Sequence, residues 1–373
     1  MMATYVQTTV NQTLLFYHPS MKSVAQQIAA KHSMITLGAL RHPEEKKTEE
    51  TETNWPTFSD GWPNLFIEGL HNVKVNDCVF LASFDTPAII FEQLAVIYAL
   101  VGNRARNMKV IVPWFPTGTM ERVSEPGEIA TASTMARLLS AIPLGVTGAT
   151  VVSFLDIHAL QEQFYFGDNV SVELKTCMGL LPLEDDDIIA FPDDGASKRY
   201  KRMFDDKKRT MIVCEKKRVG QKRIVTIKDP PDIQDVSKKR VFIVDDMIQT
   251  GGTMIQCAEA IRTKYGDVQV HMFATHGVFP ETPIDDGDSG IVTQYKNKYG
   301  NKKRWPSWYR FLNSNSVHCV YVTNSIPKNK IIQEEASIIS RNAGIKHVKF
   351  VCLDITPVIT SIISNADDPQ YDS

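Results

Sequence analysis

The 373-residue sequence lacks the long apolar run that a membrane protein needs. A transmembrane helix takes about 18 or more consecutive apolar residues, and the sequence contains no such segment. Its first residues, MMATYVQTTVNQTLLFYHP, have no basic segment before an apolar core and no arginine, so they resemble neither a signal peptide nor a transit peptide. We therefore expect no membrane partner.

The chain is also poor in cysteine and in net charge. Its six cysteines are scattered without a CxxC pair, which argues against a disulfide framework or a zinc knuckle and fits a reducing compartment. Lysine and arginine (41) nearly balance aspartate and glutamate (43), whereas nucleic-acid-binding domains are usually strongly basic. These features predict a cytoplasmic protein that does not bind nucleic acid.

What the sequence does have is a series of short apolar runs separated by helix-length segments. Runs of this kind are typical of strands buried on both faces, and their alternation with helices predicts a mostly parallel sheet. Their spacing indicates an α/β fold in two successive units, residues 1–164 and 165–373. We also expect the last helix to pack back on the first unit. The runs are 78–84, 109–115, 150–157, 187–194, 209–215, 240–246, 268–277, 318–325 and 349–355.

Two segments have the apolar stripe of an amphipathic helix, and two others look like insertions. Residues 130–141 and 253–265 repeat apolar side chains at helical spacing. Residues 42–54 are a charge run, and residues 281–310 mix turn residues, a basic patch and aromatics. We expect both of the latter segments to be surface loops.

The most informative stretch is VFIVDDMIQTGGT, residues 241–253. If 241–244 is a strand and a helix starts near Met254, the segment between them lies at a helix N-terminus, where free N–H groups and the helix dipole attract an anion. Glycines let the backbone approach a phosphate, and threonine hydroxyls add donors. Paired carboxylates suit the vicinal hydroxyls of a ribose. The stretch therefore predicts a sugar-phosphate site built from Asp245, Asp246, Gln249, Thr250, Gly251, Gly252 and Thr253.

The plainer alternative is an acidic turn followed by an ordinary glycine turn. Two acids directly before a TGGT that opens a helix are much rarer than a glycine turn, so we prefer the binding interpretation. The sequence contains neither the GxxxxGK[ST] of a P-loop nor the GxGxxG of a dinucleotide-binding fold.

The stretch resembles the ribose-phosphate-binding motif of type I phosphoribosyltransferases and of phosphoribosyl pyrophosphate (PRPP) synthetases. Several further stretches resemble the synthetases, in the expected order. FPTGTMER and DIHALQEQFYF are similar to the plant-type second class of these enzymes, which tends not to need inorganic phosphate. The resemblance implies two consecutive type I phosphoribosyltransferase-like domains. The stretches are 58–64, 112–122, 153–166, 191–199 and 214–225.

The resemblance implies that the diphosphoryl group of ATP moves to the C1 hydroxyl of ribose 5-phosphate, giving PRPP and AMP. It makes Lys216 and Arg218 catalytic, on a polar loop that closes over the substrates. It associates Mg²⁺ with His158 and Asp193. It also implies a homo-oligomer with nucleotide sites between subunits. It assigns the ATP site to Phe58, Asp60, Trp62, Asn64, Thr119, Glu121, Arg122 and Lys198.

Each of these assignments has a plainer reading from the residues alone. His158 could be a satisfied structural histidine, the basic run could be a solvated surface, and Phe58 and Trp62 could be core residues. Arg122 could pair with Glu121 instead of a phosphate. Two other functions also stay open: a phosphoribosyltransferase that consumes PRPP with a nucleobase, and a non-catalytic subunit that associates with true synthetases.

Overall fold

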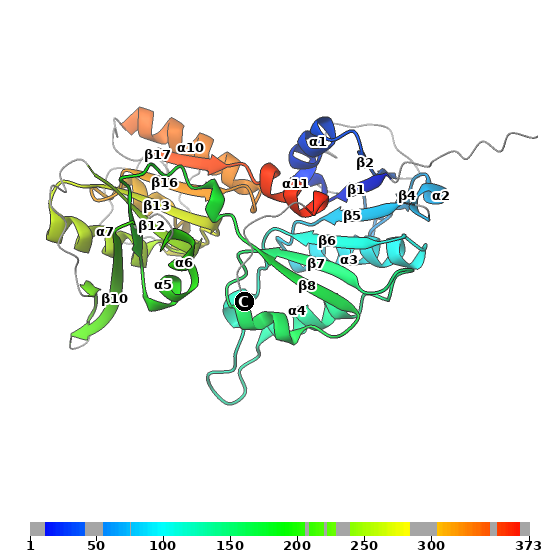
Figure 1. The fold of residues 1–373 in the computed structure, drawn as a ribbon, viewed down its shortest axis with the longest axis horizontal. Coiled ribbons are helices and arrows are strands. Elements are labelled where there is room, and N and C mark those ends of the chain that lie inside the picture. Colours follow the sequence, from blue (N-terminus) through cyan, green and yellow to red (C-terminus); the bar gives the residue numbers. More distant parts are fainter. Residues whose placement is uncertain are drawn as a thin grey trace, which may run out of the picture. The chain divides into compact units, whose positions relative to one another are not determined.

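The computed structural model describes residues 12–41, 55–74, 76–205, 209–219, 222–228, 239–283, 304–343 and 349–365. The chain divides into two units (Figure 1). Unit 1 holds the residues up to Thr176 and those from Ile355 onward, and unit 2 is Cys177–Asp354. The predicted surface loop 42–54 lies outside the described residues.

Unit 1 is built on a parallel sheet. Within its described residues the strand order is β2-β1-β5-β6-β7-β8. A buried apolar cluster fills the space between this sheet and helices α3 and α4. The strands are β1 Thr13–Tyr17, β2 Ile35–Leu37, β5 Asp77–Leu81, β6 Met108–Val112, β7 Thr150–Leu155 and β8 Val170–Lys175, with a separate pair β3 Leu40–Arg41 and β4 Phe66–Ile67. The helices are α1 Lys22–Lys31, α2 Leu70–Val73, α3 Pro87–Gly102, α4 Thr131–Ser140 and α11 Thr356–Ser364.

Unit 2 is built on a mostly parallel sheet in the order β11-β10-β9-β12-β13-β16-β17. Among its described strands, β10 and β11 pair antiparallel, and the other neighbours are parallel. The strands are β9 Ile188–Phe191, β10 Met211–Val219, β11 Lys222–Lys228, β12 Arg240–Ile248, β13 Gln269–Gly277, β16 Cys319–Thr323 and β17 Lys349–Leu353, with a separate antiparallel pair β14 Glu281–Pro283 and β15 Arg304–Pro306. The helices are α5 Asp194–Tyr200, α6 Arg202–Asp205, α7 Gly252–Tyr265, α9 Tyr309–Leu312 and α10 Lys328–Ala343.

Both predicted amphipathic helices form, because their apolar stripes face the cores. In α7 the stripe of Met254, Cys257, Ala258 and Ile261 is buried, and in α4 the corresponding four residues are buried as well. The strand β12 is apolar at each of the positions 241–244, all four of which are buried, as expected for a strand covered on both faces.

Unit 1 extends further along the chain than residue 164. The strand β8 pairs with β7 from Thr150↔Val170 to Leu155↔Lys175, so the division falls after Thr176. The reason this strand was not among the predicted apolar runs is its composition, because VSVELK is half polar and only partly buried. The helix α11 also belongs to unit 1, where it lies beside α1 (Figure 1) and where Lys109 Nζ donates to Ile362 O at 3.0 Å.

The prediction of a surface loop over residues 281–310 is wrong for the C-terminal part of that segment. Residues 284–303 lie outside the described part of the chain. After them Trp308 is 1% exposed and Tyr309 is 4% exposed, and both belong to the core of unit 2. The charged residues that precede this aromatic stretch made the whole segment look solvated, but burying two large aromatic rings is strongly favourable.

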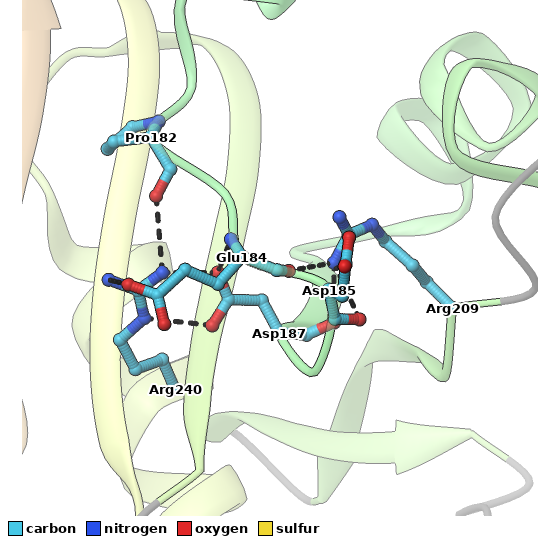
Figure 2. Close-up of polar contacts among 6 residues, drawn as sticks. All are labelled: Pro182, Glu184, Asp185, Asp187, Arg209 and Arg240. Carbon is cyan, nitrogen blue, oxygen red and sulfur yellow. Dashed lines mark hydrogen bonds and ion pairs between the residues drawn. The ribbon is translucent and has the colours of Figure 1, made fainter.

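Two arginines hold the loop that leads into β9 (Figure 2). Arg240, at the start of β12, donates from Nε and Nη2 to the two carboxylate oxygens of Asp187, at 2.8 and 2.6 Å. Arg240 also donates to Pro182 O, while Arg209 donates to the backbone oxygens of Glu184, Asp185 and Asp187. The loop is therefore tied to the start of β12 and to Arg209 just before β10, through the Asp187 carboxylate and several backbone carbonyls.

Candidate active site

The candidate residues fall into one set in each unit. In unit 2 the central feature is the segment 249–253, which leads from β12 into the first turn of α7. Its residue Gly251 caps α7 with φ 76° and ψ −7°, in the left-handed region that glycine tolerates best. A Cβ on Gly251 would also lie 2.7 Å from Phe311 Cε2, so a larger residue does not fit. The first N–H groups of this 14-residue helix have no intrahelical partner, which suits an anion.

The two acids of the motif lie inside β12, not at the end of a strand that stops at Val244. The strand continues because Met247 and Ile248 still pair with His276 and Gly277 of β13. Asp246 is 5% exposed, and its carboxylate lies 4.0 Å from Arg199 Nη1. Asp245 is only partly buried, and one of its carboxylate oxygens accepts a hydrogen bond from Asp246 N at 2.9 Å.

The electrostatics of this acidic pair are unfavourable when no ligand is present. Although the residue as a whole keeps some exposure, its carboxyl group is shielded from water, and this desolvation, followed by the neighbouring charge of Asp246, raises the pKa of Asp245 well above its usual range. Asp193 contributes to the same rise, so its carboxylate is close enough to act on Asp245. Ionisable groups with strongly shifted pKa values concentrate at functional sites, and hydroxyl donors or a cation would relieve this repulsion.

Asp193 follows β9, the strand next to β12, and caps the N-terminus of α5. Its Oδ1 accepts a hydrogen bond from Ala196 N at 3.0 Å, which orients the carboxylate as a helix cap. On the same helix Lys198 is exposed, whereas the guanidinium of Arg199 reaches Asp246. The sequence motif contained both cations, but it could not indicate that Arg199 would be the one beside the acids.

Lys216 and Arg218 lie on a strand and not on the loop that we expected. They belong to β10, where Lys216 pairs with Val225 of β11 and Arg218 with Arg223. Their side chains lie outside the described part of the structure. Lys216 and Arg218 occupy alternate positions of β10, and alternate positions of a strand share one face. Lys217, between them, pairs with Glu215 at 2.6 Å.

In unit 1 the predicted ATP loop follows β6 and turns at Gly118, where a short helical segment, η3 Gly118–Met120, begins. Thr119 and Arg122 are exposed, and Arg122 Nε lies 3.5 Å from Glu121 Oε1. The hydroxyl of Tyr165 donates to Glu121 O at 2.5 Å. The end of this loop is therefore fixed from the segment that follows β7.

The segment after β7 carries His158, which is exposed beside the ATP loop. A Cβ on Gly118 would lie 3.1 Å from His158 Cβ and 3.6 Å from the carboxylate of the buried Glu162. Asp156, two residues before His158, has φ 40° and accepts a hydrogen bond from Thr176 Oγ1 at 2.8 Å. Neither acid was among the predicted site residues, although both lie in the DIHALQE stretch that pointed to His158.

The other predicted nucleotide contacts come together in one tight loop of unit 1. Phe58 N donates to Trp62 O at 2.7 Å, Trp62 N donates to Asp60 Oδ1 at 3.3 Å, and Asn64 N donates to a backbone oxygen. Phe58 is 53% exposed and Trp62 is 58% exposed, so neither is a core residue. Trp62 meets Phe91 of α3 edge to face at 5.3 Å. The exposed rings of Phe58 and Trp62 are therefore both available to stack on a base.

Within the described residues, no three histidine, cysteine, aspartate or glutamate side chains are arranged as a complete metal-binding group. Mg²⁺ keeps several waters and takes few protein ligands. An oriented carboxylate such as Asp193, beside the acidic pair of β12, fits this kind of binding.

Two protein families match the sequence, one in each unit. The "N-terminal domain of ribose phosphate pyrophosphokinase" matches residues 13–142, and the "phosphoribosyl transferase domain" matches residues 190–302. Phosphoribosylpyrophosphate synthetase from Mycobacterium smegmatis has a TM-score of 0.65 at 20% sequence identity, over 95% of this chain and 100% of that one. At this identity the likeness shows a common fold.

Several plant proteins are more similar in sequence. Ribose-phosphate pyrophosphokinase 3, mitochondrial, of Spinacia oleracea is 43% identical over 71% of this chain. Ribose-phosphate pyrophosphokinase 4 of Arabidopsis thaliana is 42% identical over 72% of this chain and 76% of that protein. The chain spans 62% of the length of the spinach relative and of the chloroplastic relative from rice. The identity and coverage of these relatives show that the chain belongs to the ribose-phosphate pyrophosphokinase family.

Proposed function

We propose that this protein transfers the diphosphoryl group of ATP to the C1 hydroxyl of ribose 5-phosphate, giving PRPP and AMP for nucleotide biosynthesis. The observation that carries the proposal is the geometry of unit 2, where the N-terminus of α7 and the acids of β12 flank one segment of five residues. The 5-phosphate binds the backbone N–H groups of 249–253 and the hydroxyls of Thr250 and Thr253. The ribose hydroxyls donate to Asp245 and Asp246.

The ATP-binding residues belong to the first matched family region. The base stacks on Phe58 or Trp62, with Asp60 and Asn64 as hydrogen-bonding partners. Thr119, Glu121 and Arg122 are assigned to the polar part of the nucleotide, and Lys198 is assigned to the nucleotide as a further positive charge. The support for these roles is that the two aromatics are exposed and that backbone hydrogen bonds hold their loop. The Tyr165 hydroxyl holds the end of the ATP loop.

The chemical step needs positive charge around the reacting phosphates and in-line positioning more than it needs covalent help from the protein. We assign this charge to Lys216 and Arg218 on β10. Asp193 and His158 are the candidate Mg²⁺ contacts. When bound, Mg²⁺ neutralises phosphate oxygens and so makes attack on the β-phosphorus easier.

Three further points belong to this proposal. The plant-type motifs favour activity without inorganic phosphate. The burial of five of the six cysteines, none of them in a disulfide, favours a reducing compartment such as the cytoplasm. The exposed aromatics of the nucleotide loop favour a homo-oligomer in which a neighbouring subunit completes the ATP site. Within the described residues no helix is long and apolar enough to cross a membrane.

Release of AMP tests the proposal against both alternatives. The purified protein with ATP, Mg²⁺ and ribose 5-phosphate should form AMP, with or without inorganic phosphate. A phosphoribosyltransferase would instead release pyrophosphate from PRPP and a nucleobase and would form no AMP from ATP. A non-catalytic subunit would bind substrates without turnover.

A further inference from the structure

The segment Ser307–Leu312 is unusually buried for a stretch that follows a charged insertion. Ser307 is 1% exposed, and Phe311 is fully buried. The segment starts where β15 ends and contains α9. It lies just beyond residue 302, where the phosphoribosyl transferase match ends, and the proposed function assigns it no role.

Ser307 is bonded directly to the segment that we assign to phosphate binding. Its hydroxyl donates to Gln249 O at 2.9 Å, across 58 residues of sequence. Its own N–H donates to Pro280 O at 3.0 Å, and Arg310 N donates back to Ser307 O. The backbone N–H and C=O of Ser307 are therefore both hydrogen-bonded, and its hydroxyl is bonded to the carbonyl of Gln249.

Phe311 supports the same segment at Gly251, two residues after Gln249. Its ring occupies the space that a Cβ on Gly251 would need, with Cε2 at 2.7 Å from that position. Gly251 is in the left-handed conformation at φ 76°, so the ring packs against the point where the chain turns into α7. A glycine is the most flexible residue of a backbone, and a rigid neighbour limits the conformations that it samples.

The ring of Phe311 is itself fixed by two other aromatics. Phe279 meets it edge to face at 6.2 Å, and Phe350 does so at 6.0 Å. Phe279 has φ 41°, a left-handed conformation that is uncommon for a bulky residue. These contacts give the phosphate segment a firm support on its core side.

We propose that Ser307 and Phe311 are positioning residues for the 5-phosphate of ribose 5-phosphate, an inference that rests on the proposed function of unit 2. They touch the backbone of Gln249 and Gly251 and hold the segment so that its N–H groups converge on one anion. A small misplacement of such donors weakens the binding of the phosphate more than it affects the fold. The nucleotide is bound by other residues and should be little affected.

The test compares matched substitutions by kinetics and by calorimetry of ribose 5-phosphate binding. Ser307→Ala should raise both the KM and the Kd for ribose 5-phosphate by roughly five- to tenfold, the loss expected for about one hydrogen bond. The KM for ATP should stay within about twofold. Ser314→Ala is the control, because Ser314 is also buried but its hydroxyl accepts from Ser316 N and does not contact the phosphate segment. Ser307→Thr keeps the hydroxyl and should restore most of the affinity.

A second pair of variants tests the aromatic contact. Phe311→Leu should raise the KM and the Kd for ribose 5-phosphate about tenfold. Phe204→Leu removes another buried ring of unit 2, one that packs on Phe191 and not on Phe311, and should change them much less. Equal changes within each pair, or equal changes in the KM for ATP, would overturn the inference and leave the proposed function intact. Absence of turnover in the unsubstituted protein would overturn the proposed function, while calorimetry would still decide whether the two residues position the phosphate segment.

Discussion

Arg240 and Asp187 form a bidentate ion pair across 53 residues of sequence, with N–O distances of 2.8 and 2.6 Å (Figure 2). The Asp187 side chain is 4% exposed, and it also accepts a hydrogen bond from Glu184 N. Removing one partner of a buried pair leaves the other charge uncompensated. We expect Asp187→Ala to lower the free energy of unfolding by about 2 kcal/mol, since Arg240 remains partly exposed to water.

Urea unfolding followed by circular dichroism measures this loss. Glu184→Gln is the matched control, because the Glu184 side chain is 77% exposed and its contact with Arg240 is a surface ion pair. Such pairs contribute at most about 0.5 to 1 kcal/mol. Equal losses for the two variants would show that the pair does not support the loop before β9.

Lys216 should act in the chemical step, whereas its neighbour Lys217 should not. Lys216→Ala should lower kcat at least about a hundredfold and change the KM for ribose 5-phosphate by less than about threefold, because the charge is needed mainly in the transition state. Lys217 is paired with Glu215 and is 57% exposed, so Lys217→Ala should change kcat less than about twofold. Steady-state kinetics of both variants test this prediction. A similar loss of kcat at the two positions would show that Lys216 has no special part in the chemical step.

The charged carboxylate of Asp245 should lower the stability of the protein, and the same carboxylate should strengthen the binding of the sugar. Its raised pKa means that the charged form is disfavoured in the folded protein, so its contribution to stability becomes less favourable as the pH rises above about 4. Asp245→Asn removes that charge and should stabilise the protein at neutral pH. It should also weaken ribose 5-phosphate binding about tenfold.

Thermal unfolding and calorimetry on the same preparation check both effects. Asp194→Asn removes an equal charge from an exposed position that is paired with Lys228, and it should change neither quantity much. Tighter binding or lower stability in the Asp245 variant would contradict the assignment.

His271 should make the stability of the protein sensitive to acid. It is 8% exposed and stacks on Phe242, and burial lowers its pKa from 6.5 to about 4. The unfolded chain therefore binds a proton at a higher pH than the folded one, so the stability present above pH 6.5 is lost as the pH falls towards 4. His271→Phe should reduce the loss between pH 6.5 and 5 by on the order of 2 kcal/mol. Parallel pH profiles for the two proteins, from chemical unfolding, would contradict this.

The local parts of the site could be predicted from the sequence. The turn that we propose for anion binding depends on a strand, two glycines and the start of a helix within thirteen consecutive residues, all visible in VFIVDDMIQTGGT. The exposure of Phe58 and Trp62, by contrast, could not be decided, because an aromatic in a turn-rich segment suits either a core or a binding surface.

The contacts between distant segments could not be predicted. Nothing local pairs Arg240 with Asp187 or places Ser307 against Gln249. The strand character of Lys216 and Arg218 was missed because a charged, glycine-containing stretch is typical of a loop, and the pairing with β11 decides its structure. The left-handed Asp156 is likewise held by Thr176, twenty residues further along the chain.

The most direct test of the proposed function is a phosphorus NMR spectrum of the reaction. The protein is incubated with ATP, Mg²⁺ and ribose 5-phosphate, and the products are counted. Transfer of the diphosphoryl group predicts one AMP and one sugar diphosphate ester for each ribose 5-phosphate consumed, with no ADP formed. ADP together with a sugar monophosphate ester, or unchanged ATP beside an intact and folded protein, would contradict the account.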